Sequence, residues 1–148
     1  MALIVSDEEG NEIVEQTEYE NEAEMQEYIE NNPEAIPLYQ INDELEISIA
    51  VREFNVDGEF IDAIAFDQNG GVYILETKLA SNADKRKVIA QAFDYGAALW
   101  DNQHPNQFIN NLDAEIENYD SFQDWAETEL ELDEEGYEEF KENVFENL

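Results

Sequence analysis

An aspartate followed at a fixed interval by a glutamate and a lysine is the part of this sequence that could carry chemistry. Asp62 precedes the tripeptide Glu76-Thr77-Lys78 by a gap of thirteen residues. Two carboxylates, with the backbone carbonyl of Thr77 between them, supply hard oxygen ligands of the kind that Mg²⁺ prefers. A bound metal lowers the pKa of a water ligand and offsets charge on a phosphate under attack. A nearby lysine can orient that water and stabilise developing negative charge, so these residue types predict metal-assisted phosphodiester hydrolysis.

Two predicted strands must position these side chains. Residues 60–66 and 72–77 are apolar runs bounded by turn residues. On the first strand, Asp62 falls on an otherwise apolar face, where an acid costs free energy unless it has a partner or a metal. On the second strand, Glu76 and Lys78 project from the same side. If the two strands are neighbours, the three ionisable groups converge.

The residues before these strands predict a third strand and a helix. Residues 45–51 alternate apolar and polar side chains, which indicates a half-buried strand. Asp57-Gly58 and residues 69–71 are turn sequences, so the three strands form an antiparallel meander. Upstream, residues 21–32 have helical spacing, and Pro33 ends that helix.

After the third predicted strand, apolar residues again recur at helical spacing. Residues 84–100 predict one long helix, with a capping box between Ser81 and Asp84 and a break at Pro105. Its apolar residues form a broad core-facing surface made of Val88, Ile89, Ala92, Phe93, Tyr95, Ala97 and Leu99.

The sequence gives less precise predictions for the two ends of the chain. Residues 1–20 begin with a short apolar run, and both a first strand and a frayed arm are compatible with it. Residues 107–148 predict two or three acidic amphipathic helices. Trp100 and Trp125 are interpreted as anchors in the core or at an interface.

Length and composition favour a single domain. A chain of 148 residues can bury a substantial core, so residues 1–148 are interpreted as one α/β domain with a core at about 20–100 and a helical tail at about 106–148. The absence of cysteine excludes disulfides and thiolate metal sites. No stretch approaches the ~20 apolar residues of a membrane helix, so we expect a soluble protein in the cytoplasm without membrane partners.

The charge balance is extreme. Thirty-nine acidic residues against six lysines and arginines give a formal net charge of −33. Such a charge repels nucleic acid at low salt, whereas at ~1 M salt the Debye length falls to about 3 Å and the repulsion becomes local. We therefore expect a protein adapted to a salt-rich cell interior; a solvated, self-repelling surface at ordinary salt is the alternative.

These motifs together resemble the PD-(D/E)XK nuclease superfamily. Asp62 and Glu76-Thr77-Lys78 match its metal and lysine motif, and Gln91-Ala92-Phe93-Asp94-Tyr95 resembles the Gln-x-x-x-Tyr motif of its RecB-type members. Residues 72–100 as a unit are similar to the nuclease domain of archaeal NucS-type endonucleases, and residues 22–34 to the first helix of the family. The resemblance covers about residues 20–100.

The resemblance implies a fold and a reaction. The fold is a restriction-endonuclease-like core, in which helices flank a mixed sheet, and the reaction is hydrolysis of DNA by an (endo)nuclease with Mg²⁺, for which Mn²⁺ substitutes. Related domains form dimers or accompany further domains, so a homodimer or a longer chain is implied as well.

The resemblance also implies roles for individual residues. Asp62, Glu76 and the Thr77 carbonyl bind the metal, helped by Glu22, although Glu24 or Glu27 could serve instead. Lys78 activates or orients water. The pair Gln91 and Tyr95, four residues apart on one helical face, shapes the site and contacts the substrate.

Cations concentrate directly behind the lysine of this motif. Lys85, Arg86 and Lys87 account for half of the six positive residues. They are predicted to dock phosphate, because phosphate contacts supply the sequence-independent part of DNA binding. The alternative is that they offset neighbouring acids for solubility.

Two interpretations of another kind remain open. The acid-and-lysine motif could be a salt bridge on the surface of a sheet, with Asp62 and Glu76 both exposed. The chain could also be a non-catalytic acidic binding protein that imitates the charge of DNA, or a degenerate nuclease fold that acts on a protein partner.

Overall fold

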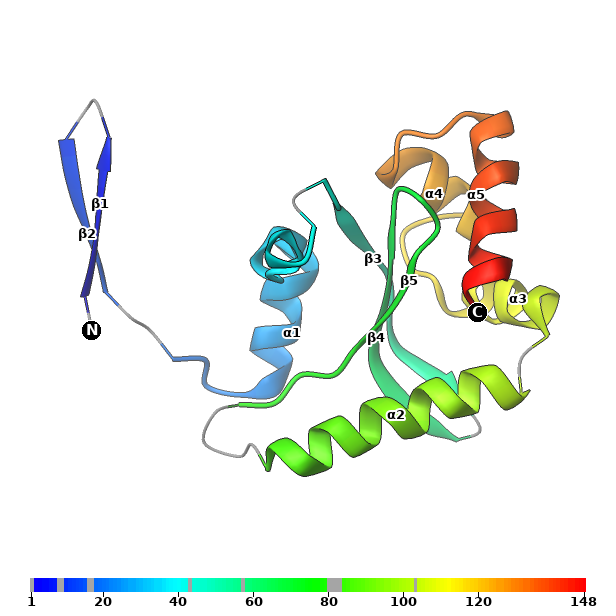
Figure 1. Cartoon of the computed structure of the whole chain (residues 1–148), viewed down its shortest axis with the longest axis horizontal. Helices are drawn as coiled ribbons and strands as arrows, with labels where there is room; N and C mark the ends of the chain where they lie inside the picture. The colour runs from blue at the N-terminus through cyan, green and yellow to red at the C-terminus, as the bar shows by residue number, and fades with distance from the viewer. Residues whose placement is uncertain are drawn as a thin grey trace.

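The part of the chain that the structure describes is a mixed α/β fold with a two-stranded hairpin, one three-stranded antiparallel sheet and five α-helices (Figure 1). The computed structural model describes residues 2–7, 10–15, 18–42, 44–56, 58–79, 84–102 and 104–148, with the side chains of 2–7, 10–15, 39, 85 and 102 excepted.

An N-terminal hairpin precedes the main sheet. It consists of β1 (Ala2–Asp7) and β2 (Gly10–Glu15), which pair with each other in antiparallel register. The apolar start of the sequence is therefore a strand, one of the two options that the sequence left open. None of the described helices is both long and apolar enough to cross a membrane.

The main sheet confirms the predicted meander. Its order is β3 (Ile47–Val56), β4 (Glu59–Asp67) and β5 (Val72–Leu75), with both pairs antiparallel. A mixed sheet would need an additional parallel strand, and the described elements that follow are helices. Of the predicted turn at Asp57-Gly58, Asp57 lies outside the described residues.

The third strand is two residues shorter than the sequence predicts, for a local reason. The ladder between β4 and β5 ends at the pair Ala63 and Leu75. Two residues on, the backbone N–H of Thr77 donates to the carboxylate of Asp62 at 2.7 Å rather than to a strand carbonyl. A side chain thus replaces the next ladder bond, and the chain leaves the sheet at Glu76.

A buried aspartate organises the turn between β4 and β5. Asp67 is 4% exposed and accepts hydrogen bonds from the backbone N–H groups of Asn69 and Gly71 and from the hydroxyl of Tyr73, at 2.7–3.0 Å. Gly70 at the tip has a φ of +82°, a conformation that favours glycine. This turn packs against the last helix, whose Asn147 donates to the Gly70 carbonyl at 3.0 Å.

Helices lie on both sides of the sheet. The first is α1 (Glu22–Asn31), with Asn21 as its N-cap, followed by the 3₁₀ turns η1 (Pro33–Ala35) and η2 (Leu38–Gln40). The others are α2 (Lys85–Asn102), α3 (Pro105–Glu115), α4 (Phe122–Glu129) and α5 (Glu134–Asn147). In Figure 1, α1 lies on one side of the sheet, α3 to α5 gather on the other, and α2 crosses its lower end.

Two helix predictions need correction. Pro105 does not simply break the chain but begins α3, because the first helical turn tolerates a residue without an N–H. The core-facing surface of α2 is narrower than predicted: Tyr95 and Leu99 are buried, whereas Ile89 and Phe93 are 58% and 75% exposed, and Ala97 is exposed as well. Ser81 of the predicted capping box lies outside the described residues.

The C-terminal helices complete the core rather than forming a peripheral tail. Phe66 of β4 packs against four aromatic rings from three different helices, namely Phe108, Phe122, Trp125 and Phe140, with centroids 4.9–6.3 Å apart. All of these rings are at most 2% exposed. The anchor role of Trp125 is thereby confirmed, whereas Trp100 is 75% exposed and lies outside the core.

The close approach of the β4–β5 turn to α5 gives a stability prediction. A Cβ added at Gly70 would lie 2.7 Å from the Cβ of Asn143, whereas one at Gly58, with a similar φ of +88°, has open space around it. We expect Gly58→Ala to lower the free energy of unfolding by about 1 kcal/mol through backbone strain alone. Gly70→Ala should lower it by roughly a further 1–3 kcal/mol because the helix must shift. Urea unfolding at fixed KCl measures both, and equal losses would contradict the packing of the turn on α5.

Candidate functional site

The chemistry-bearing residues gather where the chain leaves β5. Asp62 on β4 accepts two hydrogen bonds at its Oδ2 atom, from the backbone N–H of Thr77 at 2.7 Å and from its hydroxyl at 2.8 Å. The β4–β5 register, continued by one pair, sets Glu76 opposite Asp62, so both acids belong to the same end of the sheet.

Lys78 lies between two glutamates that come from distant parts of the chain. Its Nζ atom is 3.2 Å from Oε1 of Glu76 and 3.5 Å from Oε2 of Glu22. The Glu76 side chain is only 4% exposed, against 27% for Lys78 and 33% for Glu22. This burial is not that of a salt bridge on a sheet surface, because there both partners would be solvated.

The first turns of α1 fasten this segment to the sheet. Gln26 donates through Nε2 to the hydroxyl of Thr77 at 3.1 Å. Glu22 also accepts the backbone N–H of Leu79 at 3.5 Å. Among the three candidate glutamates of this helix, Glu22 reaches the cluster, whereas Glu24 accepts the N–H of Glu20 in the capping region.

Gln26 was missed by reasoning from the sequence. A signal was available, because Gln26 follows Glu22 by one helical turn and therefore shares its face of α1. Its side-chain amide is uncharged, so a motif made of acids and a lysine does not include it. It acts by holding Thr77, whose hydroxyl in turn donates to Asp62.

The predicted pair on α2 faces the same cluster. Gln91 hydrogen bonds the hydroxyl of Tyr95 through its side chain, and Tyr95 is 8% exposed. Burial raises the pKa of the Tyr95 hydroxyl, and the nearby negative charge of Glu76 raises it further. The hydroxyl therefore stays protonated at neutral pH and can act as a hydrogen-bond donor.

The pKa of Glu76 is raised in this environment. Burial of the carboxyl is the main cause, and the negative charge of Asp62 adds to it, while the ion pair with Lys78 partly offsets both. Ionisation of this carboxyl is therefore less favourable in the folded protein than in water, and one of its neighbours is another acid. A cation bound beside Glu76 would relieve that imbalance.

The pKa of Lys78 is also raised, with a different balance of causes. Burial alone lowers it, but the hydrogen bond and charge of Glu76, together with the charges of Asp62 and Glu22, outweigh that effect. Lys78 is therefore a cation at neutral pH. It can hold a phosphate oxygen or orient a water molecule, but it cannot take up a proton.

The donor set can accommodate a divalent cation at one atom in particular. Oε2 of Glu76 is buried and has no hydrogen-bond partner, and a buried carboxylate oxygen without a partner is costly. A hard cation would satisfy it. The described residues contain no group of three or more acidic or histidine side chains placed to hold a metal ion. In this arrangement the Nζ atom of Lys78 contacts both Glu76 and Glu22.

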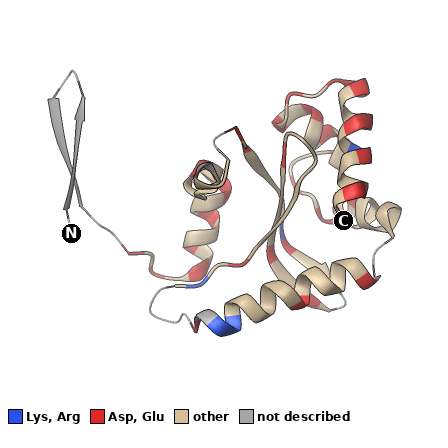
Figure 2. Cartoon of the chain, in the orientation of Figure 1, with Lys and Arg blue, Asp and Glu red and all other residues tan. Residues whose placement is uncertain are grey.

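The basic residues at the start of α2 are only partly described. Arg86 and Lys87 are exposed, and the side chain of Lys85 lies outside the described residues. Figure 2 shows positive charge at the beginning of α2 and negative charge spread over the other elements. Among the described residues, no hydrogen bond or ion pair joins the side chain of Arg86 or Lys87 to the cluster, so their predicted role in docking phosphate stays a prediction.

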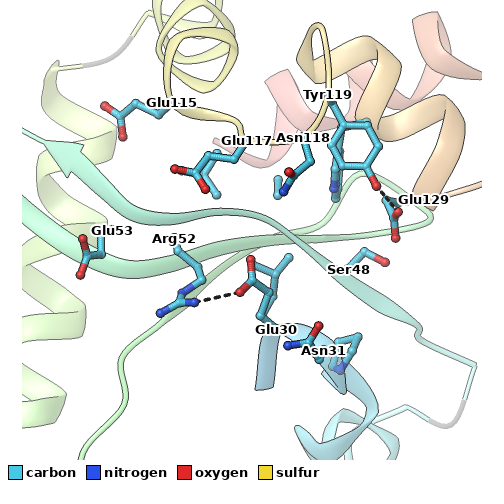
Figure 3. Close-up of a pocket in the computed structure, with 15 residues that line it drawn as sticks. Glu30, Asn31, Ser48, Arg52, Glu53, Glu115, Glu117, Asn118, Tyr119 and Glu129 are labelled. Atoms are coloured by element: carbon cyan, nitrogen blue, oxygen red, sulfur yellow. Dashed lines mark hydrogen bonds and ion pairs between the residues drawn. The ribbon is translucent and has the colours of Figure 1, made fainter. Parts of the chain in front are cut away.

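A hollow lies away from this cluster, along the edge strand β3 (Figure 3). It measures about 700 Å³, and its charged lining consists of Arg52 with Glu30, Glu53, Glu115, Glu117 and Glu129. The one cation is already paired, because Arg52 contacts Glu30 at 2.9 Å. This acidic lining repels phosphate, so size alone does not identify the site for DNA chemistry.

Comparison with protein-family models, with curated proteins and with solved structures gives no match. The function is therefore inferred from the geometry of the cluster itself.

The raised pKa of Glu76 predicts how a neutral replacement changes stability with pH. Because the folded state disfavours the ionised carboxylate, its destabilising effect is present at neutral pH and disappears as pH falls through the raised pKa. Glu76→Gln, which carries no charge at any pH, should therefore be more stable than the parent at pH 7. That advantage should vanish on acidification, as measured by urea unfolding at a series of pH values.

Glu138→Gln is the matched control for this experiment. Glu138 is also paired with a lysine, Lys141, at 3.2 Å, but its side chain is 62% exposed. Its replacement should show no such pH-dependent gain. A Glu76→Gln protein that is less stable than the parent at pH 7 would contradict the assignment of a raised pKa.

Proposed function

We propose that this protein is a metal-dependent nuclease that hydrolyses DNA phosphodiester bonds with a PD-(D/E)XK site. The observation that carries the proposal is the convergence of Asp62, Glu76, Lys78 and Glu22 from three separate elements, around a buried carboxylate oxygen of Glu76 without a partner. Burying a glutamate next to another acid costs free energy, and such pairs are typical of functional sites.

The order of the elements supports a restriction-endonuclease-like core. One helix, an antiparallel meander and a second helix follow each other from α1 to α2, as the resemblance implies. Asp62 lies within the first half of the central strand β4, and Glu76 begins the segment that leaves its neighbour β5. The long helix then returns past the cluster with Gln91 and Tyr95.

The residues suited to hold Mg²⁺, or Mn²⁺ in its place, are the acids of the cluster. Asp62, Glu76 and the Thr77 carbonyl would hold it, and Glu22 would contribute from α1. When bound, such a cation supplies a water of lowered pKa and a positive charge that offsets charge on the phosphate. Binding requires Lys78 to leave the space between Glu76 and Glu22.

Lys78 and the pair on α2 act on the substrate. Lys78 is a cation with partial exposure, so it can neutralise charge on a non-bridging phosphate oxygen as that charge grows. The protonated hydroxyl of Tyr95, oriented by Gln91, can donate to a second oxygen. Neither group takes a proton from water.

The protein's charge determines the conditions under which DNA can approach. A net charge of −33 repels the duplex at long range, whereas Arg86 and Lys87 attract its phosphates locally. At ~1 M salt the Debye length is about 3 Å, so the repulsion is screened and the contacts at the site persist. We infer a working environment of high salt, as in the cytoplasm of a cell that accumulates KCl.

Cleavage of plasmid DNA with Mg²⁺ or Mn²⁺ across a KCl series tests the proposal. We expect nicking or linearisation that increases towards molar KCl. Glu76→Ala and Lys78→Ala should each slow cleavage by roughly 100-fold or more, because each removes a group that acts at the reacting phosphate.

The chain offers a matched pair of controls. Glu138 and Lys141 form an ion pair at the same distance of 3.2 Å on the surface of α5. Glu138→Ala and Lys141→Ala should cut as fast as the parent. Cleavage that survives in both Glu76→Ala and Lys78→Ala, or that is equally lost in the controls, would overturn the nuclease proposal.

One observation favours a second candidate, a non-catalytic acidic binding protein built on the same fold. Oδ2 of Asp62 already accepts two hydrogen bonds from Thr77, and Oε1 of Glu76 is paired with Lys78, so the cluster is internally satisfied except at one oxygen. Calorimetry with Mn²⁺ separates the two candidates. The nuclease should bind Mn²⁺ stoichiometrically and lose it in Asp62→Asn, whereas the binding protein should show no saturable Mn²⁺ site in either form.

A further inference from the structure

The outward face of α2 carries an apolar stripe that the fold leaves uncovered. Ile89, Phe93 and Trp100 are 58%, 75% and 75% exposed, and Ala90 and Ala97 lie beside them and are exposed too. Spacings of four, four and three residues from position 89 to position 100 keep these side chains on one side of a helix. Three large exposed apolar residues on one helix are unusual on a surface this rich in charge.

The charge pattern along α2 differs from that of the rest of the chain. The helix spans 18 residues yet holds only two acids, Asp94 and Asp101, while Arg86 and Lys87 stand at its beginning. Positive charge thus marks one end of the stripe and a negative charge the other (Figure 2). A helix with opposite charges at its two ends is complementary to a second copy of itself in antiparallel orientation.

We propose that α2 pairs with α2 of a second copy of this chain, in antiparallel orientation across a twofold axis. An axis level with Tyr95 brings Phe93 level with Ala97 of the second copy, and Trp100 level with Ala90 of the second copy. Both of these levels then contain one large and one small side chain, so the two helices can approach closely. The twofold symmetry repeats every contact.

The same register pairs the charges. Asp101 of one copy lies level with Ile89 of the other. Arg86 of that second copy is three residues away from Ile89, or about 4.5 Å along the helix axis. A long arginine side chain spans that offset, and Lys87 lies on the side of the helix where Asp101 emerges. The interface therefore contains two symmetric sets of opposite charges at its ends.

Duplex DNA fits this face less well than a second copy does. Asp94 and Asp101 border the stripe, and both would oppose phosphate. From Ile89 to Trp100, the outward-facing described side chains are apolar apart from Asp94, so this part of the face offers no donor to a base or a backbone oxygen. The pairing does not rest on the nuclease proposal, since its grounds are the exposed stripe and the charges at the two ends of α2, and the carboxylate cluster lies on the opposite face. Arg86 and Lys87 are the residues that both proposals use.

The area of the stripe predicts a reversible dimer. Aromatic side chains bury about 150–250 Å² each when fully covered, so the three large residues contribute roughly 400 Å² per copy, against about 800 Å² per partner in an interface of standard size. Two chains of charge −33 also repel each other. The dimer should therefore form with rising protein concentration and with rising salt.

Sedimentation velocity of the full chain in KCl from about 0.1 M to about 1 M, where the Debye length falls from about 10 Å to about 3 Å, tests the pairing. We expect a monomer at low salt and a concentration-dependent dimer at high salt. Tryptophan emission gives a second readout, because Trp125 is already buried at 1% exposure and only Trp100 changes environment. Its emission should shift to the blue in step with dimer formation.

Point variants distinguish this interface from non-specific association. Phe93→Glu should weaken the dimer at least about tenfold, as loss of a central apolar contact does. Ile41→Glu is the matched control, since Ile41 is 81% exposed and lies away from α2, at the C-cap of η2, and it should leave dimerisation unchanged. Asp101→Arg should weaken the dimer, and adding Arg86→Asp to that variant should restore it.

Three results would overturn the proposal. They are a monomer at every salt and protein concentration, an equal effect of Ile41→Glu and Phe93→Glu, and a blue shift of Trp100 that appears only when duplex DNA is added. The last result would assign the face to nucleic acid instead.

Discussion

The double hydrogen bond from Thr77 to the carboxylate of Asp62 is the interaction on which the rest of the site depends. It ends β5 by substituting a side chain for the next backbone acceptor. Glu76 is thereby held opposite Asp62, and Lys78 turns back towards Glu76 and reaches α1. Without this bond the strand could continue, and successive residues would alternate between the two faces of the sheet with nothing to bring helix α1 into the cluster.

Burial gives this cluster its unusual electrostatics. A buried charge is costly unless it is paired, and here one lysine is shared among several acids in a protein with few cations. The result is a glutamate whose pKa is raised and a lysine whose positive charge is stabilised. Gln26 and Tyr95 contribute neutral hydrogen-bonding groups, so the cluster is positioned without adding further charge to it.

Helix α2 combines two tasks on opposite faces. Its inner face holds Tyr95 and Leu99 against the sheet, where Tyr95 also borders the cluster. Its outer face holds Phe93 and Trp100 away from the fold. A change on the outer face can therefore alter self-association while the cluster keeps its geometry.

Local patterns in the sequence determined the secondary structure and the pairing of Asp62 with Glu76. Alternation and turn residues mark the three strands, and in a short antiparallel meander the turn fixes the register. Caps and prolines likewise mark the helices within a few residues. These signals act between neighbours, so they can be read without knowing the fold.

Tertiary structure alone decided the burial of Glu76, the choice of Glu22 among the acids of α1, and the exposure of Ile89 and Phe93. Lys78 and Glu22 are 56 residues apart, and no spacing rule connects them. On α2, apolar residues occur almost all the way round, so helical periodicity cannot say which stripe meets the sheet. Packing chose the side with Tyr95 and Leu99, which are buried in the core next to the sheet.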